Sequence, residues 1–474
     1  MEDYQDLLVV QRALSDKEIN FGQLVAHYLA KIKANKHLNV FLDVYETESL
    51  ANADQLQSKL DDGRPMGKLF GLIIGIKDVL VYKDHPVRAG SKILAGFESQ
   101  FTGTAVQRLI DEDAIIIGMQ NCDEFAMGST NENSAYGATL NAADISKVPG
   151  GSSGASAVSV QAGLCMAALG SDTGGSVRQP AAFCGVIGLK PTYSRISRHG
   201  LIAYASSFDC IGIFTRNIAD NARILSVVAG EDTYDSTVSS REVPEYQNEL
   251  QFNKKVKVAF IKETIENEAL QPEIKQALED KLSFLKAEGH LVEEVSLAHL
   301  AYLLPTYYIL TTAEASANLA RFDGVRYGYR APEAYDLESM YKLSRTQGFG
   351  EEVKRRIMMG TFVLSASYFD AYYTKAQQVR RIIRDETRAI LSSYDFILLP
   401  TTPTTALPLS SHTDNPAEMY LADIYTVQAN VTGIPAISIP AGFDNKKMPI
   451  GVQIMTDVFK ESELYAFSNY LMHA

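Results

Sequence analysis

The most informative stretch of the chain is residues 148–191, which read VPGGSSGASAVSVQAGLCMAALGSDTGGSVRQPAAFCGVIGLKP. Two short Gly- and Ser-rich segments lie within it, residues 150–154 (GGSSG) and residues 173–176 (TGGS). The apolar run between them predicts one buried helix. Glycine lets a backbone turn sharply and lets its N–H groups approach a ligand, at a cost in folding entropy. The two segments therefore predict a site where the backbone contacts a ligand.

The segments before this stretch alternate between strand and helix. Residues 69–80 (LFGLIIGIKDVL) form a continuous apolar run with β-branched residues, which is typical of a strand buried on both faces. We expect a helix over residues 104–111 and a second buried strand over residues 114–118. Strand–helix–strand alternation predicts an α/β protein. Residues 121–137 are dense in small and polar groups, which favours a loop that lines a site.

The remaining segments are predicted to support this core. Ser15 and Glu18 have the spacing of a capping box, and the first 60 residues are expected to be largely helical, with one helix from about residue 48 to 60. The later part of the chain predicts, in order, a strand at 255–261, a helix at 272–288, a long helix at about 351–391, and strands at 395–400 and 436–440.

Composition and charge exclude several classes of protein. The 474 residues are 46% hydrophobic and 21% charged, which is typical of a globular protein. The net charge of −13 opposes non-specific binding to nucleic acid or to anionic membranes. No apolar run approaches the roughly 20 residues of a membrane span, and the chain starts with acidic residues, so we expect a cytoplasmic protein. The four cysteines predict no disulfide framework, and no His/Cys spacing predicts a bound metal.

The Gly- and Ser-rich segments can be compared with two familiar motifs. Residues 150–154 match GxSxG, which would make Ser152 the nucleophile of an α/β-hydrolase. That match is weak, because the preceding residues 146–149 (SKVP) make a poor strand and no histidine stands out as a partner. The phosphate-binding motif GxxxxGK[ST] is absent, so a nucleotide site is not expected in this chain.

A lysine can replace histidine as the base of a serine hydrolase. Lys77 lies near the end of the buried run; a lysine there usually extends its ammonium to water, but a desolvated one loses its proton more readily. With Lys77 as the base, Ser152 and Ser176 are the candidate hydroxyl groups. The N–H groups of the second segment can converge on a developing oxyanion, and their donors are Thr173, Gly174, Gly175 and Ser176. The same glycines are also compatible with a tight turn that binds nothing.

These residues resemble the amidase signature family. The resemblance rests on residues 150–154 and on residues 170–181 (GSDTGGSVRQPA), and it implies a Ser-cisSer-Lys triad. Ser176 would be the acylated nucleophile, Ser152 the bridging serine with a cis peptide bond, and Lys77 the base. The family also implies one α/β/α domain over residues 1–474, with a mixed β-sheet covered by helices and the helical segment 1–60 packed on it.

Two positions depart from the family pattern. Ala155 and Ser194 stand where glycine is commoner, and neither belongs to the implied triad.

Within this family the chain is most similar to the A subunits of glutamyl-tRNA(Gln)/aspartyl-tRNA(Asn) amidotransferases. The similarity lies in residues 123–129 (DEFAMGS), 190–193 (KPTY), 321–328 (RFDGVRYG) and 349–357 (FGEEVKRRI). It implies that free glutamine is held by Gly128, Ser129, Tyr307, Arg356 and Asp423. Arginine can pair with the α-carboxylate in a bidentate fork, and aspartate with the α-ammonium. Without the resemblance, the basic residues 354–356 indicate only a solvated helix face.

The resemblance also implies partners. Such a glutaminase hydrolyses glutamine to glutamate and ammonia and needs no cofactor or metal of its own. Its B subunit uses ATP and Mg²⁺, binds the misacylated tRNA and amidates Glu-tRNA(Gln), while a small C subunit clamps the two larger chains together. The sequence leaves open whether Asp-tRNA(Asn) is also amidated. A stand-alone amidase for another small amide and a non-catalytic scaffold remain the alternatives.

Overall fold

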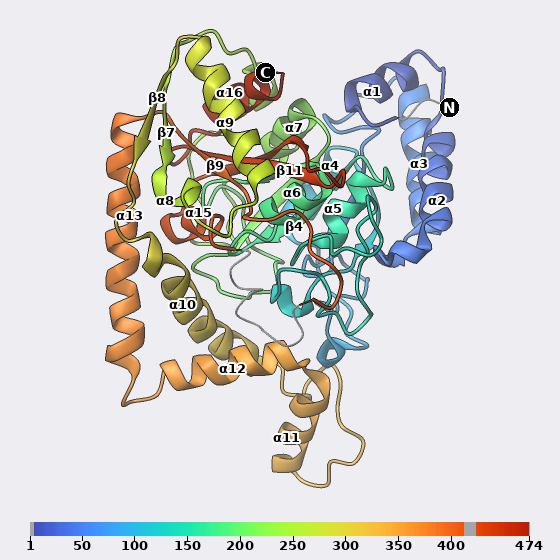
Figure 1. Ribbon diagram of the computed structural model, residues 1–474. Coiled ribbons are helices and arrows are strands. Elements are labelled where there is room, and N and C mark those ends of the chain that lie inside the picture. The colour runs from blue at the N-terminus through green and yellow to red at the C-terminus, as the bar shows by residue number, and fades with distance from the viewer. Residues whose placement is uncertain (1–3, 412–422, 474) are drawn as a thin grey trace.

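A computed structural model describes residues 4–411 and 423–473 (Figure 1). In this part of the chain one mixed sheet has the strand order β1-β3-β2-β4-β6-β5-β10-β11-β9-β7-β8. The bounds of these strands are β1 (Phe41–Val44), β2 (Ile73–Lys77), β3 (Ile115–Gln120), β4 (Ala167–Asp172), β5 (Ile187–Lys190), β6 (Cys210–Thr215), β7 (Lys257–Ile261), β8 (Leu291–Val295), β9 (Phe396–Pro400), β10 (Ala436–Phe443) and β11 (Pro449–Met455).

Helices surround this sheet. In Figure 1, α2 and α3 stand at one side of the molecule, α13 runs along the opposite side, and α11 projects below α12. The helices are α1 (Leu7–Ser15), α2 (Phe21–Ala34), α3 (Glu46–Asp61), α4 (Thr104–Asp111), α5 (Gly154–Gln161), α6 (Arg178–Cys184), α7 (Ile218–Val228), α8 (Lys262–Ile265), α9 (Pro272–Ala287), α10 (Leu303–Asn318), α11 (Leu337–Gly348), α12 (Glu351–Val363), α13 (Lys375–Ser393), α15 (Val427–Thr432) and α16 (Glu461–Met472). The predicted α/β class, with a mixed sheet covered by helices, is confirmed.

The topology brings the predicted site to one edge of the sheet. β2 pairs in parallel with both β3 and β4, so the carboxyl ends of the three strands meet at that edge. Lys77 ends β2, and Asp172 ends β4 and leads directly into residues 173–176. All residues of β2, β3 and β4 are buried, which agrees with their apolar sequences. Segments that are far apart in sequence can therefore place side chains at one point.

Three local predictions differ from the structure. The run between the Gly- and Ser-rich segments is not one helix, because α5 ends at Gln161 and β4 begins at Ala167. The predicted helix 351–391 is two helices, α12 and α13, joined by residues that are exposed from 364 to 372. Ser15 ends α1, and the capping box is formed by Asn20 and Gln23 at the start of α2. The segment 1–60 is largely helical, as predicted, and also contains the strand β1, which pairs with β3.

None of the helices described is both long and apolar enough to cross a membrane.

The two residues that depart from the family pattern have different backbone conformations. Ala155 lies in the first turn of α5, where its N–H donates to Asn131 Oδ1 at 2.9 Å, so alanine suits the position. Ser194 has a φ of 74°, in the left-handed region that disfavours residues with a Cβ. Glycine would adopt this backbone without that steric cost.

We therefore predict that Ser194→Gly stabilises the protein by about 0.5 kcal/mol, because relief of roughly 1 kcal/mol of left-handed strain exceeds the added entropy of the unfolded chain. Thermal unfolding measures this change. Ser58→Gly is the matched control, since Ser58 is an exposed residue inside α3, where glycine costs about 0.5 kcal/mol more than serine. A fall in Tm for both variants would contradict the account.

Candidate active site

The Lys77 side chain lies at the centre of the candidate site. It is fully buried, and its Nζ lies 2.6 Å from Ser152 Oγ, 2.9 Å from Ser153 Oγ and 2.9 Å from Ser171 Oγ. An ammonium has three protons, so these three hydroxyls accept one bond each and replace water. Burial lowers the pKa of Lys77 from 10.5 to about 8. The lysine is thus a base whose neutral form is accessible near neutral pH.

The hydrogen bonds favour Ser152 over Ser153 as the hydroxyl that can give Lys77 a proton. The Ser153 hydroxyl donates to the Ser171 carbonyl oxygen at 3.1 Å, so its proton is engaged. Ser152 Oγ makes the shortest of the three contacts with Nζ. When Lys77 is neutral, its lone pair can accept the Ser152 proton. The peptide bond between Gly151 and Ser152 is cis, as the resemblance implies.

Ser176 lies on the second segment, which is tied to the first. The Ser153 N–H donates to the Ser176 carbonyl oxygen at 3.2 Å, and Gln179 Oε1 accepts the Gly151 N–H at 2.8 Å. The amide of Gln179 also donates to the Ser129 carbonyl oxygen at 2.8 Å. The start of α6 is therefore bonded to the peptide that precedes Ser152 and to the loop that contains Ser129.

Asp172 sets the shape of residues 173–178. Its carboxylate accepts the N–H of Gly175 at 2.9 Å and that of Val177 at 3.1 Å, and it forms an ion pair with Arg178 at 2.9 Å. Burial raises the pKa of Asp172, but the Arg178 guanidinium outweighs this effect and holds that pKa at about 2. The carboxylate is thus ionised and can fix the turn at all physiological pH values.

These bonds refine the set of candidate oxyanion donors. The Gly175 N–H is already donated to Asp172. The other candidates are the N–H groups of Thr173, Gly174 and Ser176. The turn is also tightly packed: a Cβ on Gly174 would lie 2.4 Å from the Tyr307 hydroxyl oxygen, and one on Gly175 would lie 2.1 Å from Thr426 Oγ1. Glycine is required at both positions for this close approach.

The residues expected to hold glutamine form a second buried group. Ser129 Oγ and Tyr308 OH donate to Asp423 Oδ2 at 3.0 and 3.1 Å. Burial raises the pKa of Asp423 to about 7, while the bond from Ser129 and the charge of Arg356 act to lower it. The Arg356 guanidinium lies 5.4 Å from the centre of the Tyr308 ring. Tyr308 thus contacts both Asp423 and Arg356.

Arg356 is held by Glu352 of its own helix and by Tyr204. Its Nε donates to Glu352 Oε1 at 2.8 Å, and its Nη1 donates to the Tyr204 hydroxyl at 2.8 Å. Tyr307 packs against Gly174 and so connects this group to residues 173–176. Gly128 lies against Asp123, because a Cβ there would be 2.4 Å from Asp123 Cγ. The predicted residues therefore come together, with Tyr307 between the two parts.

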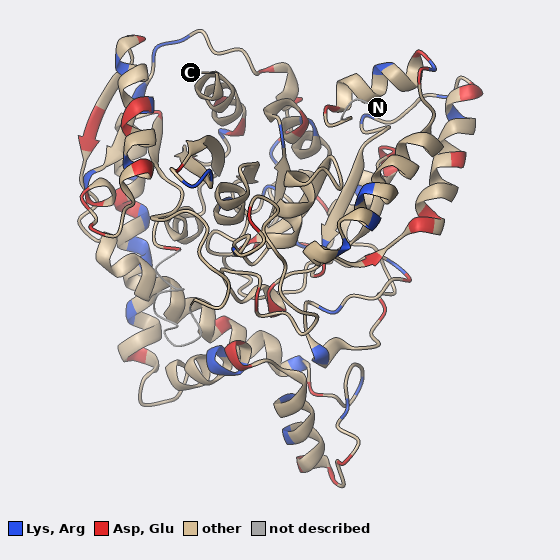
Figure 2. Ribbon diagram, turned by 45° about the vertical axis from the view of Figure 1, so that its right-hand side comes forward, with Lys and Arg blue, Asp and Glu red and all other residues tan. Residues whose placement is uncertain are grey.

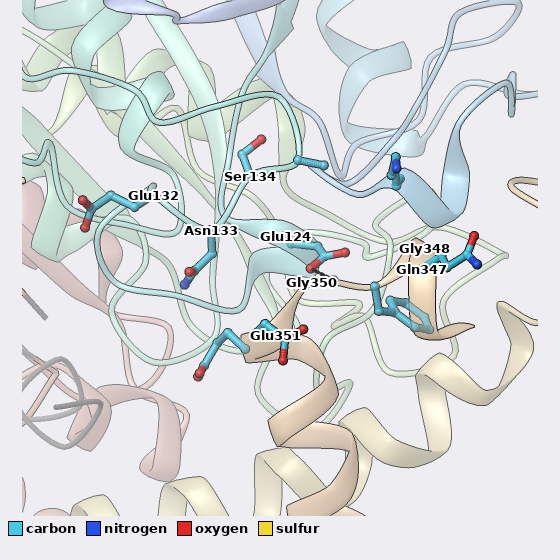
Figure 3. A pocket seen from close by; sticks show the side chains of 12 residues that line it. Glu124, Glu132, Asn133, Ser134, Gln347, Gly348, Gly350 and Glu351 are labelled. Carbon is cyan, nitrogen blue, oxygen red and sulfur yellow. Dashed lines mark hydrogen bonds between the residues drawn. The ribbon is translucent and has the colours of Figure 1, made fainter. Parts of the chain in front are cut away.

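A cavity of about 290 Å³ opens beside this group at the start of α12 (Figure 3). Glu124 and Glu352 line it, and the Gly350 N–H donates to Glu124 Oε2 at 2.8 Å. Burial raises the pKa of Glu124 to about 7. Since Glu352 also binds Arg356, the cavity adjoins the group that contains Arg356 and Asp423.

Sequence reasoning missed several of these residues. Asp172, Arg178 and Gln179 lie inside the quoted motif, which could have suggested a role for them. Glu352 likewise lies inside the quoted stretch 349–357. Tyr204 and Tyr308 carry no local signal, because their contacts with Arg356 and Asp423 depend on the folded chain.

The arrangement can perform nucleophilic attack by a serine with a lysine as base. Because the base must be neutral, kcat for amide hydrolysis is predicted to rise with pH and to reach half of its maximum near pH 8, the pKa of Lys77. A pH–rate profile under saturating substrate measures this. The control is Lys77→Arg. Its guanidinium stays charged, so this variant should remain inactive up to about pH 10. A rate that is flat or falls between about pH 6 and 9 would contradict this assignment.

Comparison with known proteins agrees with this chemistry. Residues 23–465 match the amidase family model. The A subunit of the glutamyl-tRNA(Gln) amidotransferase of Chlorobium phaeobacteroides (strain BS1) is 48% identical over 472 residues, which covers 99% of this chain and 98% of the relative. The A subunit of the same enzyme from Chlorobaculum tepidum is also 48% identical, over 99% of this chain and 97% of its own length.

Solved structures show the same likeness. A crystal structure of the glutamyl-tRNA(Gln) amidotransferase A subunit from Thermotoga maritima superposes with a TM-score of 0.77 at 38% identity, over 94% of this chain and 89% of that one. A crystal structure of an amidase superposes with a TM-score of 0.84 at 28% identity, over 99% of both chains. By its sequence, its fold and its lysine–serine cluster, this chain belongs to the amidase family.

Proposed function

We propose that this chain is the glutaminase component, or A subunit, of a glutamyl-tRNA(Gln) amidotransferase. The observation that carries the chemistry is the buried Lys77 ammonium, bonded to three serine hydroxyls at 2.6 to 2.9 Å. The relatives that are 47 to 48% identical over 99% of this chain carry the name of that component and support the choice of substrate.

The proposed reaction has two steps. Ser176 Oγ attacks the side-chain amide carbon of glutamine, and its proton passes through the Ser152 hydroxyl to neutral Lys77. The oxyanion accepts hydrogen bonds from the N–H groups of Thr173, Gly174 and Ser176. The C–N bond then breaks, the nitrogen takes up the proton from Lys77, and ammonia leaves a γ-glutamyl ester on Ser176. Water attacks this ester by the same proton path, which releases glutamate and restores the serine.

The buried group beyond Tyr307 is proposed to bind the amino-acid end of glutamine. Arg356 would pair with the α-carboxylate and the ionised Asp423 with the α-ammonium. Gly128 and Ser129 would complete this pocket, since Ser129 already bonds to Asp423. Tyr307 would lie along the substrate between this pocket and Ser176. The pocket would thereby select a free amino acid over other small amides.

The partners follow from this function. The ammonia would pass to a B subunit that uses ATP and Mg²⁺ to amidate Glu-tRNA(Gln), with a C subunit clamping the two together in the cytoplasm. This chain would need no cofactor of its own. Its net charge of −13 agrees with tRNA being bound by the B subunit rather than by this one.

The nucleophile assignment predicts that Ser176→Ala, assembled with its companion subunits, releases ammonia from glutamine roughly 10³-fold or more slowly than the wild type. A coupled ammonia assay measures the rate, and circular dichroism verifies the fold. Normal ammonia release by the folded variant would rule out the triad. Equal and negligible release by both proteins would favour the non-catalytic scaffold.

The substrate assignment predicts that Arg356→Lys raises KM for glutamine at least about 10-fold, because an ammonium cannot pair with a carboxylate in a bidentate fork. Arg355→Lys is the matched control: Arg355 bonds to the same Glu352, but its side chain is 45% exposed. An unchanged KM for Arg356→Lys would favour a stand-alone amidase that takes another amide.

A further inference from the structure

Exposed apolar side chains concentrate where α12 ends and α13 begins. Of the twenty-two large hydrophobic residues exposed in the described part of the chain, eight lie within residues 358–382. Their exposed fractions range from 36% to 72%. We call this surface the α12–α13 corner; it consists of Met358, Met359, Phe362, Leu364, Tyr368, Phe369, Tyr372 and Ile382. In Figure 1 it lies at the lower end of α13.

The aromatic rings of this corner form one cluster. The rings of Phe362 and Tyr368 have centroids 4.3 Å apart, and those of Phe362 and Tyr372 are 5.7 Å apart. Residues 364–372 are exposed without interruption. Because the rings contact one another while remaining exposed, they present a continuous apolar face to water. Clusters of this kind on soluble proteins mark surfaces that bind another protein, and aromatic residues and Met are enriched there.

The charge beside this face indicates the nature of its partner. Helix α13 carries five Lys or Arg residues against two Asp or Glu, whereas the whole chain has a net charge of −13 (Figure 2). The side chains of Arg381 and Arg384 are 77% and 39% exposed, and both also pair with the exposed Asp385 of the same helix, at 3.8 and 3.4 Å. A symmetric contact with a second copy would bring these positive helices together, which is unfavourable. A partner with an apolar surface edged by carboxylates fits better.

We propose that the α12–α13 corner is the surface on which a companion subunit of the amidotransferase docks. The inference rests on the proposed function, which requires such a partner. The bound partner buries the Phe362 cluster, and its carboxylates face the exposed arginines of α13.

The corner also has a direct connection to the substrate group. The buried side of α12, away from the exposed Met358 and Phe362, carries Arg356. Glu352 bonds to both Arg356 and the half-exposed Arg355. A partner docked on α12 therefore contacts the helix that positions the proposed α-carboxylate ligand.

The test is co-expression of the full chain with the B and C subunits of its own organism, followed by titration of the purified chain with those subunits. Phe362→Ser and Tyr368→Ser are expected to weaken binding at least about 10-fold, because aromatic residues at the centre of an interface dominate its affinity. The matched control is Phe443→Ser, since Phe443 lies on β10 and is 69% exposed. It should bind as the wild type does.

Two further measurements make the outcome decisive. The double variant Arg381→Glu, Arg384→Glu changes only exposed charges and should fold normally, weaken binding and reduce its dependence on salt. If all corner variants bind the companion subunits as tightly as the wild type, the docking surface lies elsewhere and the proposal is wrong. If light scattering shows a wild-type dimer that the corner variants lose, the occupant is a second copy instead. If the wild type itself binds neither companion subunit, the proposed function is wrong, whatever result the corner variants give.

Discussion

The structure depends on one buried positive charge. Lys77 has no exposed surface, and its ammonium is surrounded by the hydroxyls of Ser152, Ser153 and Ser171. Removing such a charge from water is costly, and the hydroxyls recover only part of that cost, so the pKa of Lys77 falls toward neutrality. The parallel strands β2 and β4 and the turn at Gly151 all serve to bring these groups to one point. The proposed base is therefore a consequence of the fold.

A buried ion pair determines where the proposed nucleophile, Ser176, lies. Asp172 and Arg178 are both inaccessible to water, and Asp172 receives N–H groups from the turn that carries Ser176. The guanidinium of Arg178 also donates to the Thr426 carbonyl oxygen and to Asn430, which belongs to α15. This network joins the turn to a segment near the end of the chain. Asp423 lies just before α15, so the proposed glutamine-binding group and the proposed nucleophile are connected through this network.

Much of this could be predicted from sequence, and the exceptions have physical causes. The strand predicted within residues 69–80 contains β2, the strand predicted over 114–118 overlaps β3, and the helix predicted over 104–111 is α4, because apolar runs and periodicity are local signals. The break between α12 and α13 was missed because its residues are compatible with a helix, and only their exposure in the folded chain distinguishes them. The proposed triad came from a motif and a family resemblance. The bond from Arg356 to Tyr204 joins residues 152 positions apart, and no local pattern predicts it. The prediction that residues 1–474 form one domain stays a prediction.

The central claim is that Ser176 carries the γ-glutamyl group while Lys77 holds the proton. The most direct test is mass spectrometry of the complete enzyme, acid-quenched during turnover of glutamine and digested to peptides. The account predicts a γ-glutamyl ester on the peptide that contains Ser176, and its loss in Ser176→Ala. An adduct on Ser152 instead, or steady turnover with no adduct on any serine, would contradict it.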